Sequence, residues 1–564
     1  MNLKVLGWLF LSLSICLSAC KKEEEKIPSP VISLAIEPKV IKLAKDEPFG
    51  IPLKISFLNT DAEEDLSVGW TSENPRIASV TPAGVVWPEG AGETSVVATM
   101  KNGKAQARCR VIITDNYDYK YRLVLKDKGN SGLTLSQPEA FLSTKALERR
   151  RKHGVGIDQD DLPISPQYLK MIRETGGVII AKSKWLNTVS VHCSDEFLID
   201  KYKALPFVKE VVLVWRGKRS DAQPAKKYED SPQAGSTATQ KGPLDYGVAR
   251  TNININNGQY LHERGFRGAG IDIAVIDAGF KGLDKNPAFK DVHIKGAKSF
   301  VYENDDPYSI DDHGVWVTSC MAVNMPGNYV GTAPEANYWL FRTEDQSSEY
   351  PIEEDYWINA AEYADSVGVD IINSSLSYTN GYSFPTQFYT FKDMDGKTAL
   401  ASRAANVAAR KGILIVNCAG NDHSWVGTPA DSPNVLTVGA VDQSLNADLF
   451  TAYGLTSDNR IKPDVMALGG NAFVINGLGK SERRSGTSYA SPIMCGQAAC
   501  LWQAFPSLTN LEIQDLIRRS GDKAVRPEIP FGYGIPNMET AAGLMGMRRS
   551  VLPPVSRATK KSGN

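Results

Sequence analysis

The chain has 564 residues, of which 63 are Lys or Arg and 64 are Asp or Glu, so its formal net charge is −1. At roughly 150 residues per domain, this length predicts three or four domains, and 42% hydrophobic with 23% charged residues is the composition of ordinary globular protein. A near-neutral chain has no surplus of cations to displace the counterions of a nucleic acid. The composition therefore excludes a nucleic-acid partner and general disorder.

Residues 1–19 are typical of an export signal. Lys4 precedes an apolar run at residues 5–19, which is shorter than the roughly 20 residues that a membrane-spanning helix needs. The run ends in LSAC at Cys20, which resembles the lipobox of bacterial lipoproteins and implies acylation of Cys20; a plain secretory signal is the alternative. Residues 20–30 form a predicted tether, and their Lys- and Glu-rich start resembles the export signal of surface lipoproteins in the Bacteroidetes. We expect an outer-membrane or cell-surface protein held by lipid.

Eight cysteines are present, of which Cys16 leaves with the signal and Cys20 would carry lipid. The other six lie in apolar or small-residue runs, where a thiol packs as a small hydrophobic group, so no disulfide framework is predicted. Export still permits an occasional disulfide. The sequence has no Cys/His cluster with metal-ligand spacing, so no metal site is predicted. The six are Cys109, Cys193, Cys320, Cys418, Cys495 and Cys500.

Residues 31–115 have an all-β pattern. Short alternating runs at residues 51–57, 95–100 and 107–113 are separated by turns rich in Pro, Gly and Asn. The segment that starts at Trp70 (WTSENPRIASVTPAGVVWPEGAGETSVVAT) resembles bacterial Ig-like group 2 domains. That resemblance implies a β-sandwich that serves as a spacer, with an adhesion role as the alternative.

Residues 117–217 are predicted to form a small α/β unit. A strand-like run at residues 121–127 precedes a charged helical stretch at 140–152, and its basic run at 149–152 is expected to be a solvated helix face. The segment at 187–215 (NTVSVHCSDEFLIDKYKALPFVKEVVLVW) resembles the end of the inhibitory propeptide of subtilisin-like proteases. The amino-terminal half of this unit is longer than in those propeptides.

Residues 218–243 are polar and rich in Pro, Gly, Ser and Ala, so a linker is predicted where maturation cuts would fall. Residues 547–564 form a second polar, basic tail. Between them, residues 244–546 alternate short β-branched runs with helical segments, which predicts a doubly wound parallel sheet with its ligand crevice at the carboxyl ends of the strands. The expected strands lie at 271–276, 370–373, 413–416 and 435–441, and a helix is expected at 399–411.

Three motifs at predicted strand ends or helix starts would meet at that crevice. Asp277 ends the strand segment IAVID, His313 opens a helix in DHGVWV, and Ser488 lies in SGTSYASP. In this chain order the motifs resemble the subtilisin-like (S8) serine peptidases, a likeness that covers most of residues 244–546. The resemblance implies that Ser488 is the nucleophile, His313 the general base and Asp277 the carboxylate that orients the imidazole.

The residue types suit this chemistry. A serine hydroxyl needs an adjacent base, and among six histidines only His313 lies at a loop-to-helix boundary with a following glycine that leaves room beside the ring. Taken alone, Ser488 could be a helix cap and Asp277 could cap a turn, and Asp311 and Asp312 are rival acids. The coincidence of three motifs in the right order favours the triad.

Further segments resemble the oxyanion and substrate-binding parts of the same family. Asn421 follows a buried strand and a glycine, which implies that its amide and the Ser488 backbone N–H stabilise an oxyanion. The alternative is an asparagine chosen for a left-handed turn. The predicted substrate-lining residues are Ser375, Leu376, Ser377, Ala419 and Gly420.

Four residues depart from the family pattern. Val315 and Trp316 stand where the family usually has threonine and a second histidine, and Tyr489 replaces the common methionine after the nucleophile. Ser377 replaces a glycine of the substrate strand. None of these changes removes a proton-transfer group, but Trp316 and Ser377 are expected to narrow the cleft.

The sequence thus predicts a subtilisin-like α/β catalytic domain, preceded by a propeptide-like α/β domain and an all-β Ig-like sandwich. Its predicted function is that of an exported, lipid-anchored serine endopeptidase, acting as a monomer on proteins or peptides. Propeptide cleavage would either release the enzyme or leave it held through a bound propeptide; the third alternative is that no cut occurs. The alternative is a catalytically inactive surface binding or adhesion protein. No cofactor is predicted; calcium is common in the family, but the sequence offers no assignable ligands.

Overall fold

A computed structural model of the chain describes residues 33–547, except for 46, 48, 59–64, 91, 115–116, 194–197, 219–243, 303–304 and 380. The predicted signal, Cys20, the tether, nearly all of the linker and nearly all of the tail lie outside the described residues. Among the helices that are described, none combines the length and hydropathy needed to cross a bilayer.

Residues 33–114 form only β-strands among the described elements, as the alternating pattern predicts. The strands make a four-stranded sheet in the order β2-β9-β8-β5, a three-stranded sheet β3-β7-β6 and the pair β1-β4. Inward-facing side chains such as Ile41, Val96 and Val111 are fully buried between them. The strands are β1 (Ser33–Glu37), β2 (Val40–Ala44), β3 (Ile51–Pro52), β4 (Lys54–Leu58), β5 (Val68–Ser72), β6 (Ala78–Val80), β7 (Val85–Pro88), β8 (Gly92–Met100) and β9 (Gln106–Thr114).

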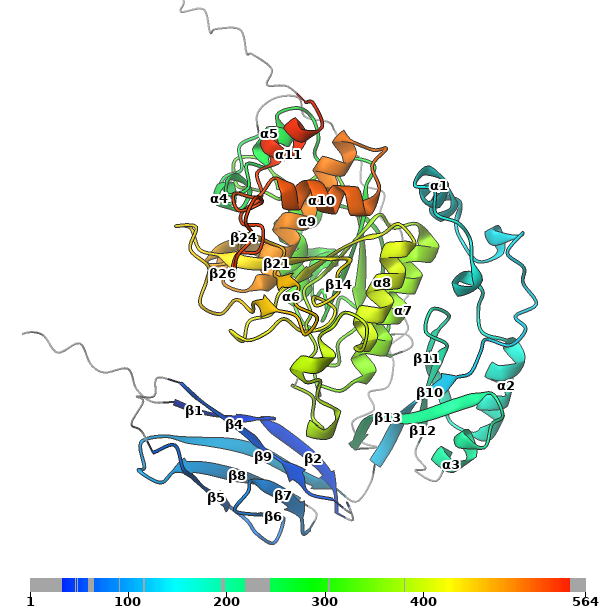
Figure 1. The fold of residues 1–564 in the computed structure, drawn as a ribbon, viewed down its shortest axis with the longest axis vertical. Coiled ribbons are helices and arrows are strands. Elements are labelled where there is room, and N and C mark those ends of the chain that lie inside the picture. The colour runs from blue at the N-terminus through cyan, green and yellow to red at the C-terminus, as the bar shows by residue number, and fades with distance from the viewer. Residues whose placement is uncertain are drawn as a thin grey trace, which may run out of the picture.

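Residues 117–218 form an antiparallel sheet in the order β11-β12-β10-β13, with two helices against one face. Leu169 and Ile172 of one helix and Tyr202 of the other pack on this face, while the opposite face of the sheet lies toward α7 (Figure 1). The elements are β10 (Tyr117–Leu125), α1 (Thr144–Lys152), α2 (Pro166–Thr175), β11 (Val178–Ser183), β12 (Thr188–Cys193), α3 (Leu198–Lys203) and β13 (Val208–Lys218).

The rest of the chain is built on a seven-stranded parallel sheet in the order β15-β18-β14-β19-β20-β21-β24. The predicted doubly wound fold is confirmed. The strands are β14 (Asp272–Asp277), β15 (His293–Ser299), β18 (Asn337–Arg342), β19 (Ile371–Ser374), β20 (Leu414–Cys418), β21 (Val435–Val441) and β24 (Val465–Leu468). Short antiparallel pairs lie outside this sheet: β16 (Asn324–Met325) with β17 (Tyr329–Val330), β22 (Gly454–Leu455) with β23 (Ile461–Lys462), and β25 (Ala472–Ile475) with β26 (Ser481–Arg484).

Helices cover both faces of this sheet. Figure 1 shows α7 and α8 on one side of the sheet and α9 on the other. Apolar side chains of α7 and α8 form one core with the sheet, and those of α6 and α9 form another. α9 is buried over most of its length because it is rich in small residues such as Gly496 and Ala498. The helices are α4 (Arg250–Asn254), α5 (Gln259–His262), α6 (His313–Ala322), α7 (Ile352–Val367), α8 (Leu400–Arg410), α9 (Thr487–Ala504), α10 (Asn510–Arg519) and α11 (Met538–Leu544).

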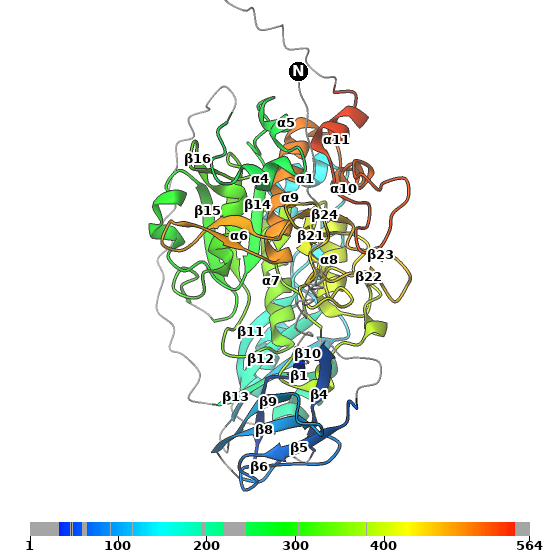
Figure 2. The ribbon, with the colours of Figure 1, turned by 90° about the vertical axis from the view of Figure 1, so that its left-hand side faces the viewer.

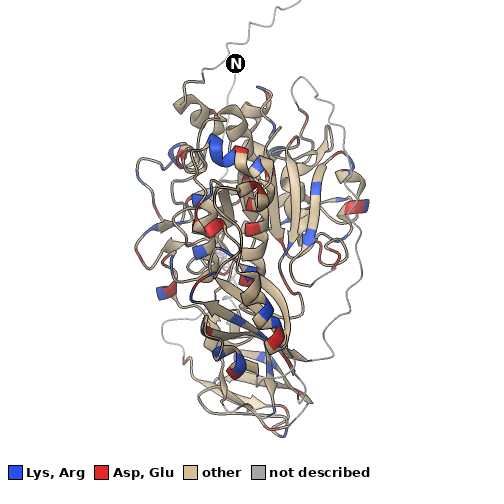
Figure 3. Cartoon of the chain, turned by 90° about the vertical axis from the view of Figure 1, so that its right-hand side faces the viewer, with Lys and Arg blue, Asp and Glu red and all other residues tan. Residues whose placement is uncertain are grey.

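The basic run at residues 149–152 is solvated only in part: Arg151 and Lys152 are exposed, as predicted. Arg149 and Arg150 are buried rather than solvated, and both pair with Asp365 of α7. Arg150 also pairs with Asp161 of its own unit. Because their acidic partner is more than 200 residues away, no local pattern could reveal that these cations are part of an interface. Elsewhere basic and acidic residues are interspersed in Figure 3, in keeping with the near-zero net charge.

The six cysteines within the described residues are buried and free, as predicted from their apolar surroundings. Burial raises the pKa of the Cys109, Cys320 and Cys418 thiols to about 12. They therefore stay protonated and behave as small apolar groups.

Candidate active site

Asp277 is the last residue of β14, a strand buried along its whole length. Its side chain is fully buried, and Oδ1 accepts hydrogen bonds from the Ala278 backbone N–H (2.8 Å) and from His313 Nδ1 (2.6 Å). Oδ2 has no hydrogen-bond partner among the described residues. The strand therefore delivers one carboxylate, from the middle of the sheet, directly to the imidazole.

His313 begins α6, immediately after two aspartates that were rival candidates for its partner. Asp311, at φ 47°, accepts a hydrogen bond from the His313 backbone N–H (2.7 Å) instead of from the ring. Burial alone would lower the pKa of His313, but the charge and hydrogen bond of Asp277, with the charges of Asp311 and Asp312, raise it above 6.5. Asp277 is thus the carboxylate that contacts the imidazole, and the two neighbours act through their charge.

Ser488 lies in the first turn of α9, which begins after Gly486. It is 7% exposed, and its carbonyl oxygen accepts a hydrogen bond from Ser375 Oγ (3.0 Å). The ring of the next residue, Tyr489, lies 6.2 Å from the ring of His313. No hydrogen bond joins Ser488 Oγ to His313 among the described residues, and such contacts commonly tighten only when substrate binds. α9 thus carries the hydroxyl to the side of the sheet on which α6 carries the imidazole.

Asn421 follows Gly420, whose φ of 111° turns the chain at the end of β20. Its side-chain oxygen accepts hydrogen bonds from the Thr487 backbone N–H (2.8 Å) and hydroxyl (2.9 Å). These bonds hold the Asn421 amide so that its NH₂ group is left for another acceptor, next to the residue before the predicted nucleophile. The left-handed-turn alternative does not describe this position, because Asn421 is not among the residues with positive φ.

The predicted substrate-lining residues lie at the carboxyl ends of β19 and β20. Ser375 is buried and linked to Ser488, while Leu376 and Ser377 are partly exposed. Asn417 Nδ2 donates to the Leu376 carbonyl oxygen (2.9 Å), which fixes this segment against β20. A Cβ added at Gly420 would lie 3.6 Å from Ser377 Oγ, so the two segments that are predicted to line the substrate pocket lie close together. Ala419 is fully buried beside them.

Two of the four residues that depart from the expected pattern, Trp316 and Tyr489, border the imidazole. Trp316 lies three residues after His313 in α6, and the two rings pack edge to face with their centres 6.1 Å apart. The guanidinium of Arg484 stacks on Trp316, 3.9 Å from the ring centre, and its Nε donates to Glu482 (2.7 Å). An exposed cation and two aromatic rings, Trp316 and Tyr489, therefore form the surroundings of His313.

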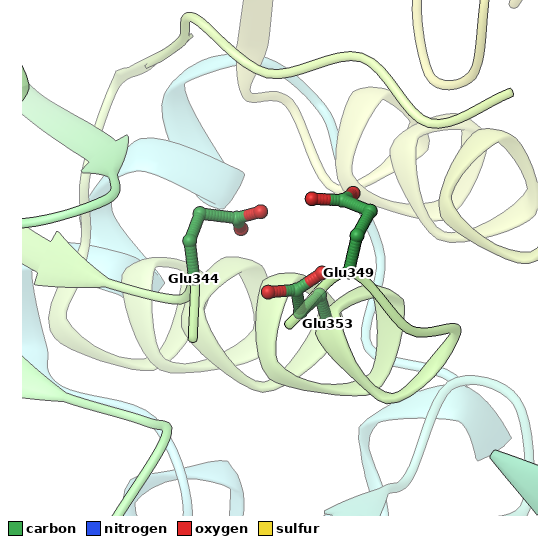
Figure 4. A group of neighbouring side chains, drawn as sticks. All are labelled: Glu344, Glu349 and Glu353. Atoms are coloured by element: carbon green, nitrogen blue, oxygen red, sulfur yellow. The ribbon is translucent and has the colours of Figure 1, made fainter. Parts of the chain in front are cut away.

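A group of three glutamates was not predicted from the sequence. Figure 4 shows the carboxyl groups of Glu344, Glu349 and Glu353 turned toward one another, with their oxygens within 4.8 Å. Burial raises the pKa of Glu344 to about 7, and Tyr378 donates a hydrogen bond to Glu344 (2.7 Å). Carboxylate oxygens suit hard cations. Protons and neutral donors satisfy the same groups, so no ion is assigned.

The propeptide-like unit packs on α7 through buried polar contacts. Arg122 of β10 donates to both oxygens of Asp355 (2.6–2.9 Å), and Ser190 of β12 donates to the same carboxylate (3.1 Å). Further along α7, Glu362 accepts hydrogen bonds from the Ser183 hydroxyl of β11 and the Trp185 backbone. Two carboxylates of α7 therefore bind strands β10, β11 and β12 of this sheet.

Comparison with known proteins gives two matches along the chain. Residues 268–535 match the family described as the subtilase family (Peptidase S8), and residues 120–230 match the Peptidase S8 propeptide domain of Bacteroidota. Subtilisin NAT from Bacillus subtilis subsp. natto is 27% identical over 402 residues, covering 70% of this chain and 90% of the relative. Subtilisin from Bacillus pumilus is 29% identical over 291 residues, covering 50% of this chain and 94% of the relative. A solved structure titled "Structure of Prenylagaramide maturation protease PagA" aligns at 22% identity and a TM-score of 0.42, covering 51% of this chain and 97% of that one.

Proposed function

We propose that this chain is a subtilase-family serine endopeptidase preceded by an S8 propeptide domain, and that Ser488, His313 and Asp277 are its catalytic triad. The observation that carries the proposal is the 2.6 Å bond between Asp277 and His313 at the carboxyl edge of the parallel sheet. In open α/β sheets this edge is where ligands bind.

The proposed reaction has two halves. Ser488 Oγ attacks the peptide carbonyl carbon while its proton passes to His313 Nε2, and the resulting imidazolium is stabilised by Asp277. The C–N bond then breaks as His313 gives that proton to the leaving amine. Water repeats the sequence on the acyl-enzyme and releases the carboxylic acid and the free Ser488 hydroxyl.

The oxyanion of each tetrahedral intermediate would accept hydrogen bonds from the Asn421 amide and the Ser488 backbone N–H. The fixed orientation of the Asn421 amide supports this role, because a donor that is already aimed needs no reorganisation during the reaction. An extended substrate would pair its backbone with the segment Ser375, Leu376 and Ser377, beside Ala419 and Gly420.

Labelling with a fluorophosphonate probe tests the triad. Mature protein should be labelled, and Ser488→Ala should abolish the labelling while leaving the fold unchanged by circular dichroism. A fully processed, folded protein that the probe does not label would instead favour an inactive surface binding or adhesion protein.

Further proposals concern where the protein is located and how it matures. We propose that Cys20 is lipidated, that residues 31–115 form an Ig-like domain, that residues 117–217 act as an inhibitory propeptide and that the cut falls in 218–243. The polar composition of this linker and the contacts between the propeptide-like unit and α7 support the last two points.

Immunoblots of membrane and medium fractions, for the chain with Cys20→Ala and without it, test anchoring. Size-exclusion chromatography tests the monomeric state.

A further inference from the structure

The β-sandwich of residues 33–114 contacts both of the other parts of the molecule. One buried core contains Leu43 and Val111 of the sandwich, Trp215 of β13, and Tyr350 and Phe384 of the peptidase domain. Figures 1 and 2 both show the sandwich beside β13 at one end of the molecule. A spacer that only lengthens a tether would not need a core shared with the parts that it separates.

Arg216 of β13 lies at the centre of this junction. Its side chain is 5% exposed and pairs with Glu47 of the sandwich, which is 7% exposed, and it also donates to the Lys42 carbonyl oxygen (3.2 Å). The guanidinium lies 4.8 Å from the ring centres of Tyr117, in the propeptide-like unit, and Phe384, in the peptidase domain. One buried cation therefore joins all three parts.

Neighbouring contacts extend the same junction. Lys54 of β4 lies 4.8 Å from the ring centre of Phe388, and Gln387 donates a hydrogen bond to the Leu213 carbonyl oxygen of β13. The Tyr117 hydroxyl donates to the Leu43 carbonyl oxygen of β2. Residues 384–388 of the peptidase domain are thus held by the sandwich on one side and by β13 on the other.

The Arg216–Glu47 pair is expected to contribute to the stability of this junction because both side chains are buried. Removing one partner of a buried ion pair leaves an uncompensated charge, which is strongly unfavourable, whereas exposed pairs contribute little. The sandwich also has an exposed pair, Arg110–Glu93, with side chains 55% and 53% exposed. The two pairs are therefore expected to differ in what their loss does, although each takes its carboxylate from the sandwich.

We propose that the β-sandwich is part of the inhibitory segment, so that residues 33–218 bind the peptidase domain as one unit. After a cut in the linker, the Arg216 junction slows the departure of the propeptide from the peptidase domain. The proposal rests on the proposed function in so far as it takes the propeptide to be inhibitory and the cut to fall in the linker.

The dissociation rate of the cut complex tests this proposal. The full chain would carry Ser488→Ala, so that it cannot process itself, and a recognition site for a specific protease within the linker. After cutting, the peptidase half is immobilised by a carboxyl-terminal tag and loss of the amino-terminal half is followed by interferometry. Glu47 and Arg216 both stay in the amino-terminal half after the cut, so their pair acts on the peptidase domain through the contact of Arg216 with Phe384. We expect Glu47→Gln, which leaves the buried Arg216 charge without its carboxylate, to raise the dissociation rate by about tenfold, and Glu93→Gln to leave it unchanged.

The proposal is overturned if Glu47→Gln dissociates at the unmodified rate, or if Glu93→Gln accelerates dissociation equally. Should Glu47→Gln lose its native near-ultraviolet circular dichroism, Phe384→Leu decides, because it alters the junction without changing the sandwich; an unchanged rate then overturns the proposal. The experiment measures binding by a protein that is already inactive, so an error in the proposed catalytic roles would not change its result.

Discussion

Two groups of buried charges in this molecule are built differently. The pair Asp277–His313 is incomplete: Asp277 Oδ2 has no partner among the described residues, and the His313 side chain is 25% exposed. Under the propeptide-like unit, Arg149 and Arg150 are at most 2% exposed and engage both oxygens of Asp365. The first arrangement leaves a partly exposed ring that can gain and lose a proton. The second is closed to solvent, although Arg149 Nε and Arg150 Nε have no partner among the described residues. Contact with solvent therefore distinguishes the reactive pair from the buried interface.

Removing the charge of Asp277 should have the largest effect on activity. Asp277→Asn keeps the side-chain shape but no longer favours the imidazole tautomer that accepts the Ser488 proton, so kcat should fall on the order of 10⁴-fold. Turnover of a peptide substrate measures this. Asp311→Asn is the matched control, because Asp311 binds the His313 backbone rather than its ring; equal losses in the two variants would contradict the assignment.

Removing the charge of Asp365 should act on stability instead. Asp365→Asn leaves two buried guanidinium groups without their shared carboxylate, which is expected to lower the free energy of unfolding by about 3–5 kcal/mol. Denaturant unfolding of the full chain with Ser488→Ala measures the change. Asp515→Asn, which breaks an exposed pair with Arg519, should shift the midpoint very little. If both variants unfold alike, the buried charges around Asp365 do not hold this interface.

The sequence predicted the reactive pair Asp277–His313 and missed the buried ion pairs of the interface. β21 coincides with its predicted range, and the contact between Asp277 and His313 followed from motifs at strand and helix ends. By contrast, the run containing Arg149 looked solvated, because charge alone does not reveal a partner on a distant helix. The junction at Arg216 and the glutamates of Figure 4 were missed for the same reason, since each depends on which segments folding brings together.

The pH dependence of activity should follow His313. Its pKa is raised above 6.5, so the neutral ring that accepts the Ser488 proton becomes dominant only as the pH rises through that higher value. We expect kcat/KM of the mature enzyme to rise with pH around a midpoint above 6.5, and to fall about tenfold for each pH unit below it. A midpoint below 6.5 would mean that burial outweighs the charge of Asp277 at this ring.

The smallest expected effect lies at the edge of the site. Arg484 stacks on Trp316, which borders His313, while Arg483 stacks on the ring of Phe473 at 4.5 Å. Each stacking is worth about 0.5–1 kcal/mol at an exposed position, so Arg484→Ala and Arg483→Ala should lower the free energy of unfolding by similar amounts. Only Arg484→Ala releases a ring that packs beside the imidazole, so kcat/KM should change, by about two- to fivefold, in that variant alone. Equal activity in both variants would mean that the Trp316 side chain does not help to position His313, and that this departure from the family pattern affects packing rather than catalysis.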